Sequence, residues 1–198
     1  MTLRRLFWIC LALLAVLAFQ RWGERPITHA PGVLVAETPA QDAIEESSFR
    51  LDDYMITRRA RFAIRARVLG RERYRFDGAA GVSPVDLALG WGPMSDQAVL
   101  DQIDVDQSGR WFWLRWELPP PLPEQVAMGH SGNMHMIPAE RWIEKELLRL
   151  RPGQVVELRG YLVDVDRDDG WYWRTSLSRD DVGDGSCEIV YVEHVTTE

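Results

Sequence analysis

The sequence is poor in the residues that cross-link small exported domains. Its 198 residues include only two cysteines, Cys10 and Cys187. Cys10 lies in an apolar N-terminal run, so the two cannot pair within one folded domain, and the fold must be stabilised by its core. Lysine occurs once, at Lys145, and the formal net charge is -7. This acidic balance lacks the basic excess typical of nucleic-acid-binding proteins, so we do not expect nucleic acid as a partner.

Long apolar runs are also scarce, and the single one lies at the N-terminus. It covers residues 6–19 and has arginines on both sides. A spanning helix typically needs about 20 apolar residues, so the run has the length of a signal-peptide core. Its small-residue cleavage signal is imperfect. We therefore predict that residues 1–22 are a retained membrane anchor rather than a cleaved signal segment. Residues 6–20 would cross a membrane once, with the domain on the exported side.

Composition indicates one globular domain after this segment. The chain is 46% hydrophobic and 27% charged, which is ordinary for a folded protein. Residues 23–48 are rich in proline and end in an acidic stretch. This composition predicts a linker over residues 23–48, followed by the folded domain over residues 49–198.

Period-two alternation predicts a long first strand. Between Phe62 and Phe76, apolar residues fall largely on even positions, while arginines occupy odd positions. A helix would distribute those arginines around its circumference, so the alternation predicts one strand, bent at Gly70.

The later elements are predicted from turn and helix signals. Ser83 and Pro84 have the form of a short helix start, and residues 103–105 and 111–117 form a predicted hairpin. Pro138 opens a predicted helix. The stretch Pro123–Ala139 joins the hairpin to this helix, and its apolar side chains are expected to pack under the barrel. Three further strands are predicted over residues 155–165, 171–178 and 187–195.

This element order predicts a mainly β (α+β) fold. A long bent strand, a hairpin, a helix and a second hairpin resemble a small OB-like antiparallel barrel with one helix between strands 3 and 4. The barrel would be preceded by the N-terminal membrane helix. Another small antiparallel barrel or a rolled α+β sheet is the alternative.

The first strand and the hairpin supply candidate ligand-binding residues. Arg65 and Arg67 lie on the basic face of the strand, and Trp111 and Trp113 could provide stacking platforms, as aromatic residues do in OB folds. The alternative is structural. The arginines would face acidic neighbours or water, and the tryptophans would belong to the core.

A candidate metal site lies in the hairpin. Asp104, Asp106 and Ser108 alternate as in the first half of a calcium loop, with Gly109 behind them. The acidic ligand expected six residues after the glycine is replaced by Arg115. We therefore favour turn chemistry without a metal.

The stretch from His130 to Ala139 carries the candidate catalytic residues. His130, Asn133 and His135 could combine with Cys187 as base, orienting amide and thiol nucleophile. The two histidines could instead begin a zinc site. The structural alternative is that Asn133 and His135 satisfy buried backbone groups, and that Cys187 is a small buried apolar residue.

Two segments, His130–Ala139 and Asp86–Met94, resemble uncharacterised bacterial proteins that have a short N-terminal membrane segment. The resemblance extends from about Phe62 to Tyr191. It implies a location in the cell envelope and no particular activity. No site residue follows from it.

These observations lead to two hypotheses. The favoured one is a membrane-anchored extracytoplasmic binding or assembly module of the bacterial cell envelope, with an envelope protein as partner and no cofactor. The alternative is an envelope hydrolase that uses His130, His135 and Cys187 or a metal-assisted site.

Overall fold

The computed structural model describes residues 5–12, 25–178 and 187–198 and is mainly β. Residues 5–12 are helical. Within the described ranges, no helix combines the length and apolar character needed to span a membrane. The rest of the predicted anchor, residues 13–22, lies outside the described residues.

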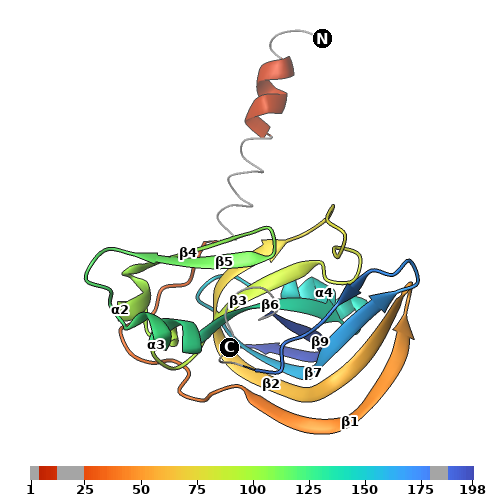
Figure 1. Ribbon diagram of the computed structural model, residues 1–198. Helices are drawn as coiled ribbons and strands as arrows, with labels where there is room; N and C mark the ends of the chain where they lie inside the picture. The colour runs from red at the N-terminus through yellow and green to blue at the C-terminus, as the bar shows by residue number, and fades with distance from the viewer. Residues whose placement is uncertain (1–4, 13–24, 179–186) are drawn as a thin grey trace.

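Strands are the main regular structure of the domain, and four short helices lie between them in its described part (Figure 1). The strands are β1 (Ala40–Leu51), β2 (Tyr54–Arg73), β3 (Val85–Gly90), β4 (Ile103–Ser108), β5 (Trp111–Trp116), β6 (Ser131–Pro138), β7 (Val155–Arg167), β8 (Tyr172–Trp173) and β9 (Glu188–Thr197). The helices are the 3-10 helix η1 (Gly92–Ser95), α2 (Gln97–Leu100), α3 (Glu124–Gly129) and α4 (Arg141–Leu147).

The main sheet closes on itself because β2 pairs both with β3 and with β7. Its hydrogen-bonded order is β1-β2-β3-β6-β9-β7-β8, and β2 also pairs with β7. The pairings therefore connect β2, β3, β6, β9 and β7 into a ring. Strands β6 and β9 run parallel, while the other pairs described in this sheet are antiparallel. Helix α4 lies between β6 and β7, the third and fourth ring strands in chain order.

Strand β2 has 20 residues, and different parts of it pair with β7 and β3. Its first two thirds pair with β7, and its end pairs with β3. The register shift in the β2–β3 pair lies between Val68 and Gly70, at the predicted bend. A Cβ at Gly70 would lie 2.3 Å from Oε1 of Gln107 on the β4–β5 hairpin, so a side chain there would displace the Gln107 amide. The alternation before the bend is confirmed, since Phe62, Ile64 and the other even positions are buried.

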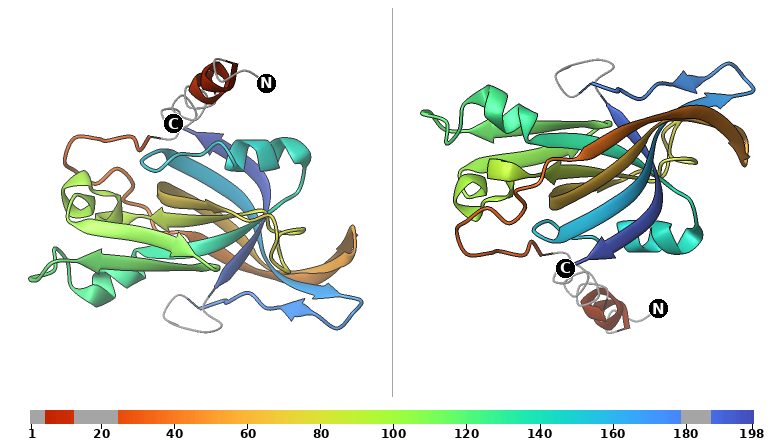
Figure 2. Two further views of the ribbon diagram at one scale, coloured as in Figure 1. Left: turned by 90° about the horizontal axis from the view of Figure 1, so that it is seen from above. Right: turned by 90° about the horizontal axis from the view of Figure 1, so that it is seen from below.

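The core fills the ring, and α4 packs against it. Phe62 and Ile64 of β2 contact a cluster that includes Ile143 and Leu147 of α4. Figure 2 shows α4 and the β4–β5 hairpin on different sides of the ring. Full burial of each such side chain contributes about 1.5–3 kcal/mol, so the apolar cluster can stabilise the domain without a disulfide.

Two predictions for the middle of the chain were wrong. Ser83 and Pro84 do not start a helix, because Val85–Gly90 form the fully buried strand β3. Residues 131–138 are not a connector packed under the sheet but strand β6 of the ring. A short apolar run has no clear period, so only its partner strands decide between helix and strand.

The boundaries of the domain also differ from the prediction. Strand β1 begins at Ala40, and Val35 is fully buried, so part of the predicted linker 23–48 belongs to the folded domain. The predicted hairpin does form, but β4 and β5 make a separate two-stranded sheet. The ring positions assigned to the hairpin are occupied by β3 and β6.

Candidate functional site

The candidate site lies on the outer face of the β3–β6 pair. Alternate residues of these strands, including Leu87 and Met134, face the core of the ring. Their neighbours Asp86, Asn133 and His135 therefore face the opposite side. Asp86 lies directly opposite His135 in the strand register. This outer face is nevertheless buried, with Asp86 and His135 each 0% exposed.

The β4–β5 hairpin and β8 cover this face. From strand β4 of the hairpin, Gln107 donates from Nε2 to Oδ1 of Asn133 at 2.7 Å. Asn133 donates in return from Nδ2 to the backbone carbonyl of Arg110 at 3.0 Å. The ring of Trp173 lies 4.5 Å from the ring of His135, tilted by 42°. Asn133 and His135 of β6 are thus covered by the β4–β5 hairpin and by β8.

Asp86 is the centre of this arrangement. Its Oδ1 accepts a hydrogen bond from Nη1 of Arg110 at 2.7 Å. Its Oδ2 lies 3.4 Å from Nδ2 of Asn133 and 2.9 Å from Nδ1 of His135. The His135 contact is close in distance but lacks hydrogen-bond geometry, since neither ring nitrogen has a well-oriented partner among the described residues. Arg110 is therefore the main partner of the buried carboxylate.

Arg110 joins Asp86 to a second carboxylate. Its guanidinium binds Asp77 through Nε at 2.8 Å and Nη2 at 2.9 Å, and Nη2 also donates to the carbonyl of Ser83 at 2.8 Å. The guanidinium lies 3.7 Å from the ring centre of Tyr74, whose hydroxyl accepts the backbone N–H of Arg110. Arg110 has a φ of 74°, so these contacts hold a non-glycine residue in the left-handed region. We call Asp77, Asp86, Arg110, Asn133 and His135 the Asp86 cluster.

The electrostatics of the Asp86 cluster follow from burial and pairing. Burial lowers the pKa of Arg110, but its bonds to Asp77 and the charges of Asp86 and Asp77 outweigh that effect and raise the pKa. Burial acts to raise the pKa of Asp77, yet the hydrogen bond and charge of Arg110 hold it below its usual range. Burial also raises the pKa of Tyr74 to about 12. The guanidinium and Asp77 are therefore charged near neutral pH, and the phenol is neutral.

The structure brings together two of the four catalytic candidates. Asn133 and His135 share the Asp86 cluster, whereas His130 lies at the end of α3, where its Nδ1 is 2.8 Å from the carbonyl oxygen of Val126. Cys187 is half-buried and immediately precedes β9. The parallel β6–β9 register begins with Met134 opposite Glu188, so Cys187 lies just before the paired residues.

The candidate ligand-binding residues occupy two separate places. Arg67 is buried and donates to the carbonyl of Ser95 at 3.1 Å and to Oε1 of Gln97. Arg65 pairs with Glu198 of the C-terminal end, Nη2 to Oε2, at 2.7 Å. These contacts tie chain segments together. The tryptophans instead lie on the exposed face of the hairpin, where Trp111 is 40% exposed and Trp113 is 42% exposed.

The metal candidates do not form a loop. Asp104, Asp106 and Ser108 lie on strand β4, where their side chains share the exposed face of the hairpin. Arg115 of β5 pairs with both carboxylates, at 3.7 Å from Asp104 and 3.1 Å from Asp106. In the described part of the chain, no group of three or more His, Cys, Asp or Glu side chains is placed to hold a metal ion.

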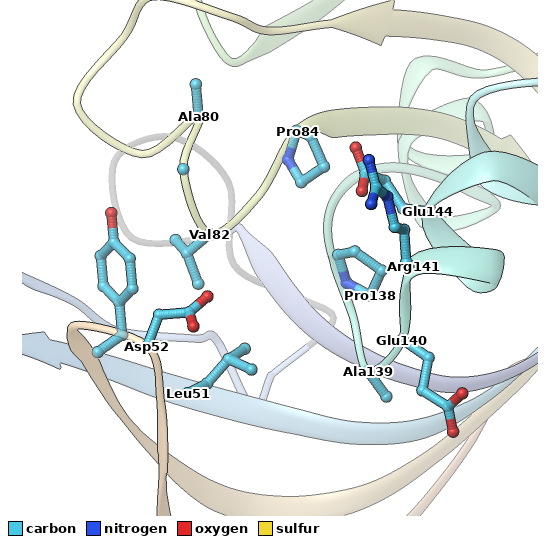
Figure 3. Close-up of a pocket in the computed structure, with 12 residues that line it drawn as sticks. Leu51, Asp52, Ala80, Val82, Pro84, Pro138, Ala139, Glu140, Arg141 and Glu144 are labelled. Carbon is cyan, nitrogen blue, oxygen red and sulfur yellow. The ribbon is translucent and has the colours of Figure 1, made fainter.

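Two hollows in the surface lie outside the Asp86 cluster. A pocket of about 270 Å³ opens between the β1–β2 turn, the loop before β3 and the start of α4 (Figure 3). Val82, Pro84 and Pro138 line it together with Asp52 and Glu144. A broader groove of about 830 Å³ runs along the base of the β4–β5 hairpin. Neither is lined by Asp86, Asn133 or His135.

No protein-family model, curated protein or solved structure matches the chain. The site is therefore interpreted from its own geometry.

Asp86, Arg110 and Trp173 were missed as site residues by the sequence analysis. Asp86 offered one signal, because it is the charged residue in the apolar run Val85–Gly90, and a buried charge needs a partner. Arg110 and Trp173 offered none, since both reach the cluster from turns or short strands far along the chain. Only the tertiary structure brings these residues to the Asp86 cluster.

Proposed function

We propose that the ring is an OB-type barrel. Five ring strands, a parallel pair formed by the third and the last, and a helix between the third and fourth support this assignment. The β4–β5 hairpin is then an insertion between the second and third barrel strands. It covers the outer face of β3 and β6, the surface on which OB folds commonly bind ligands.

We further propose that the chain is a binding or assembly module rather than an enzyme. The observation that carries this proposal is the burial of the Asp86 cluster. A catalytic imidazole must reach a substrate, but His135 is fully buried, stacks on Trp173 and lines neither surface hollow. Arg110 neutralises the carboxylate that would orient it. The cluster therefore fixes the hairpin on the ring, and the hairpin offers its other face to a partner.

The proposed setting is the bacterial cell envelope. The apolar run flanked by arginines supports a single-pass anchor in the inner membrane through residues 6–20, with the domain in the periplasm and an envelope protein among its partners. Intact-mass measurement of the protein purified from the membrane fraction tests retention of the anchor. A mature N-terminus near Phe19 would show cleavage.

A second candidate function, an envelope hydrolase, is favoured by one observation. Cys187 immediately precedes β9, whose first residue, Glu188, pairs with Met134 of β6, and β6 also carries Asn133 and His135. A thiol, an imidazole and an amide in neighbouring segments are the components of a nucleophilic site. The burial of His135 and its neighbour Asp86 opposes this function, since substrate would have to displace Trp173.

Site-specific photo-crosslinking in cells tests the binding module. The full-length chain would carry a photoreactive phenylalanine analogue at position 113 or, as a matched exposed tryptophan position, at 142 on α4. We expect adducts from position 113 and none from position 142. An absence of adducts at position 113, combined with a His135→Ala variant that keeps its melting temperature but loses its cellular function, would contradict the module and support the hydrolase.

A further inference from the structure

The exposed face of the β4–β5 hairpin is organised into two parallel rows. Strand β5 contributes Trp111, Trp113 and Arg115 at alternate positions, and these side chains are exposed. The strand register places Ser108, Asp106 and Asp104 directly opposite them on β4. Alternate residues on one strand lie about 7 Å apart, and residues opposite one another have Cβ atoms about 5 Å apart. An aromatic row therefore runs beside a row of hydroxyl and carboxylate groups.

The charges on this face restrict its occupant. Arg115 pairs with Asp104 and Asp106, so the row is rich in hydrogen-bonding groups but has a net charge of only one negative unit from these three residues. Carboxylates beside the aromatic rings would repel the phosphates of a nucleic acid. Entry of the rings into a lipid interface would desolvate the same carboxylates. A neutral ligand that is rich in hydroxyl groups is not repelled by the carboxylates and can hydrogen-bond to them.

The face continues into the broad groove at the base of the hairpin. Asp104 and Arg115 line that groove as well, together with Trp116 and Leu118, and Leu118 is 86% exposed. The aromatic row and the groove thus form one elongated surface along β5. Its shape suits an extended chain better than a compact molecule, because stacking sites follow one another along a straight strand.

We propose that this surface binds an extended, uncharged polysaccharide of β-linked pyranose units. Successive sugar rings stack their flat C–H faces on Trp111 and Trp113, because an indole offers a large rigid apolar plane. Their hydroxyl groups reach across to Asp106 and Ser108, where a carboxylate oxygen accepts a charge-assisted hydrogen bond. The inference rests on the proposed binding function and names the class of its ligand.

Isothermal titration of the full-length protein in detergent micelles with chitotetraose and with cellotetraose tests this assignment. We expect saturable binding of at least one of them by the wild-type chain. The double variant Trp111→Ala/Trp113→Ala should lose at least 10-fold in affinity, and Asp106→Asn should lose about 5–10-fold. Trp142→Ala removes a slightly more exposed tryptophan on α4 and should bind as the wild type does.

Two results would overturn the proposal. One is that neither tetrasaccharide binds the wild-type chain. The other is that the double tryptophan variant binds as the wild type does while its melting temperature is unchanged. If crosslinks at position 113 persist in cells and neither sugar binds, the polysaccharide assignment fails and the binding module stands. Protein or lipid adducts then identify the occupant.

Discussion

Asp86 and His135 face each other across the β3–β6 pair, with Asp86 Oδ2 2.9 Å from His135 Nδ1 and both side chains inaccessible to solvent. Arg110 approaches the other carboxylate oxygen from the turn of a hairpin that lies outside the ring. A strand pair and a separate two-stranded sheet are thereby joined through one buried carboxylate. The stability of the hairpin on the ring should therefore depend on these three side chains.

Replacing His135 should destabilise the domain. His135→Ala removes the ring that stacks on Trp173 and leaves a cavity beside Asp86. We expect a loss of about 2–4 kcal/mol in the free energy of unfolding. Denaturant titration of the full-length protein measures it. His130→Ala is the control and should cost no more than about 1 kcal/mol, since His130 is half-buried and its imidazole contacts the carbonyl of Val126, a residue in its own helical turn. Equal stability of the two variants would contradict a structural role for His135.

Removing the charge of Arg110 should have a larger effect. Arg110→Gln leaves the carboxylate of Asp86 buried without its cation, and breaking one side of a buried ion pair costs about 3–5 kcal/mol. Arg115→Gln is a matched control on the exposed face of the same hairpin, and a surface pair contributes about 0–1 kcal/mol. Melting temperatures of both variants check the difference. Comparable values would show that Asp86 is not held by Arg110.

Stability should fall in acid through Asp77. The pKa of Asp77 lies below its usual range in the folded protein because Arg110 outweighs the effect of burial, so the folded state binds fewer protons than the unfolded one. The stabilisation is present above the unfolded pKa, about 4, and is lost as the pH falls through the folded value. Urea unfolding between pH 6 and pH 3 should show a shallower decline for Asp77→Asn. Identical slopes for the two proteins would contradict this assignment.

Ser95 should hold the segment before β1 on the domain. Its hydroxyl accepts the backbone N–H groups of Leu34 at 3.1 Å and Val35 at 3.0 Å, and it donates to the carbonyl of Gly92 at 2.7 Å. Ser95→Ala leaves these groups without the partner, at about 1–3 kcal/mol. Hydrogen exchange at Leu34 and Val35 should accelerate by about 10-fold or more.

Ser108→Ala is the control for that experiment. Ser108 is exposed on the hairpin, so its replacement should leave exchange at Val35 unchanged. Exchange that is equally slow in Ser95→Ala and in the wild type would show that the segment is held by other contacts.

Some features of this protein follow from the sequence alone because they are local. The alternation from Phe62 to Val68 predicts β2, since period two places one face of a strand in the core whatever its partners are. The β4–β5 hairpin is local for the same reason, because its turn joins the two strands that pair. The register shift between Val68 and Gly70 is also local, because it lies at a glycine, which has no side chain to place at the bend.

Only the tertiary structure decides the ring and the Asp86 cluster. Val85–Gly90 carries no period that distinguishes a helix from a strand, and it becomes β3 because β2 and β6 lie on either side of it. Whether Asp86 meets Arg110 and His135 depends on where the hairpin folds over the ring. Arg110 is 24 positions from Asp86 in the chain, and His135 is 49 positions from it. Local propensity does not predict such pairs. The interaction between their side chains stabilises the protein only after the intervening strands have paired and brought the residues together.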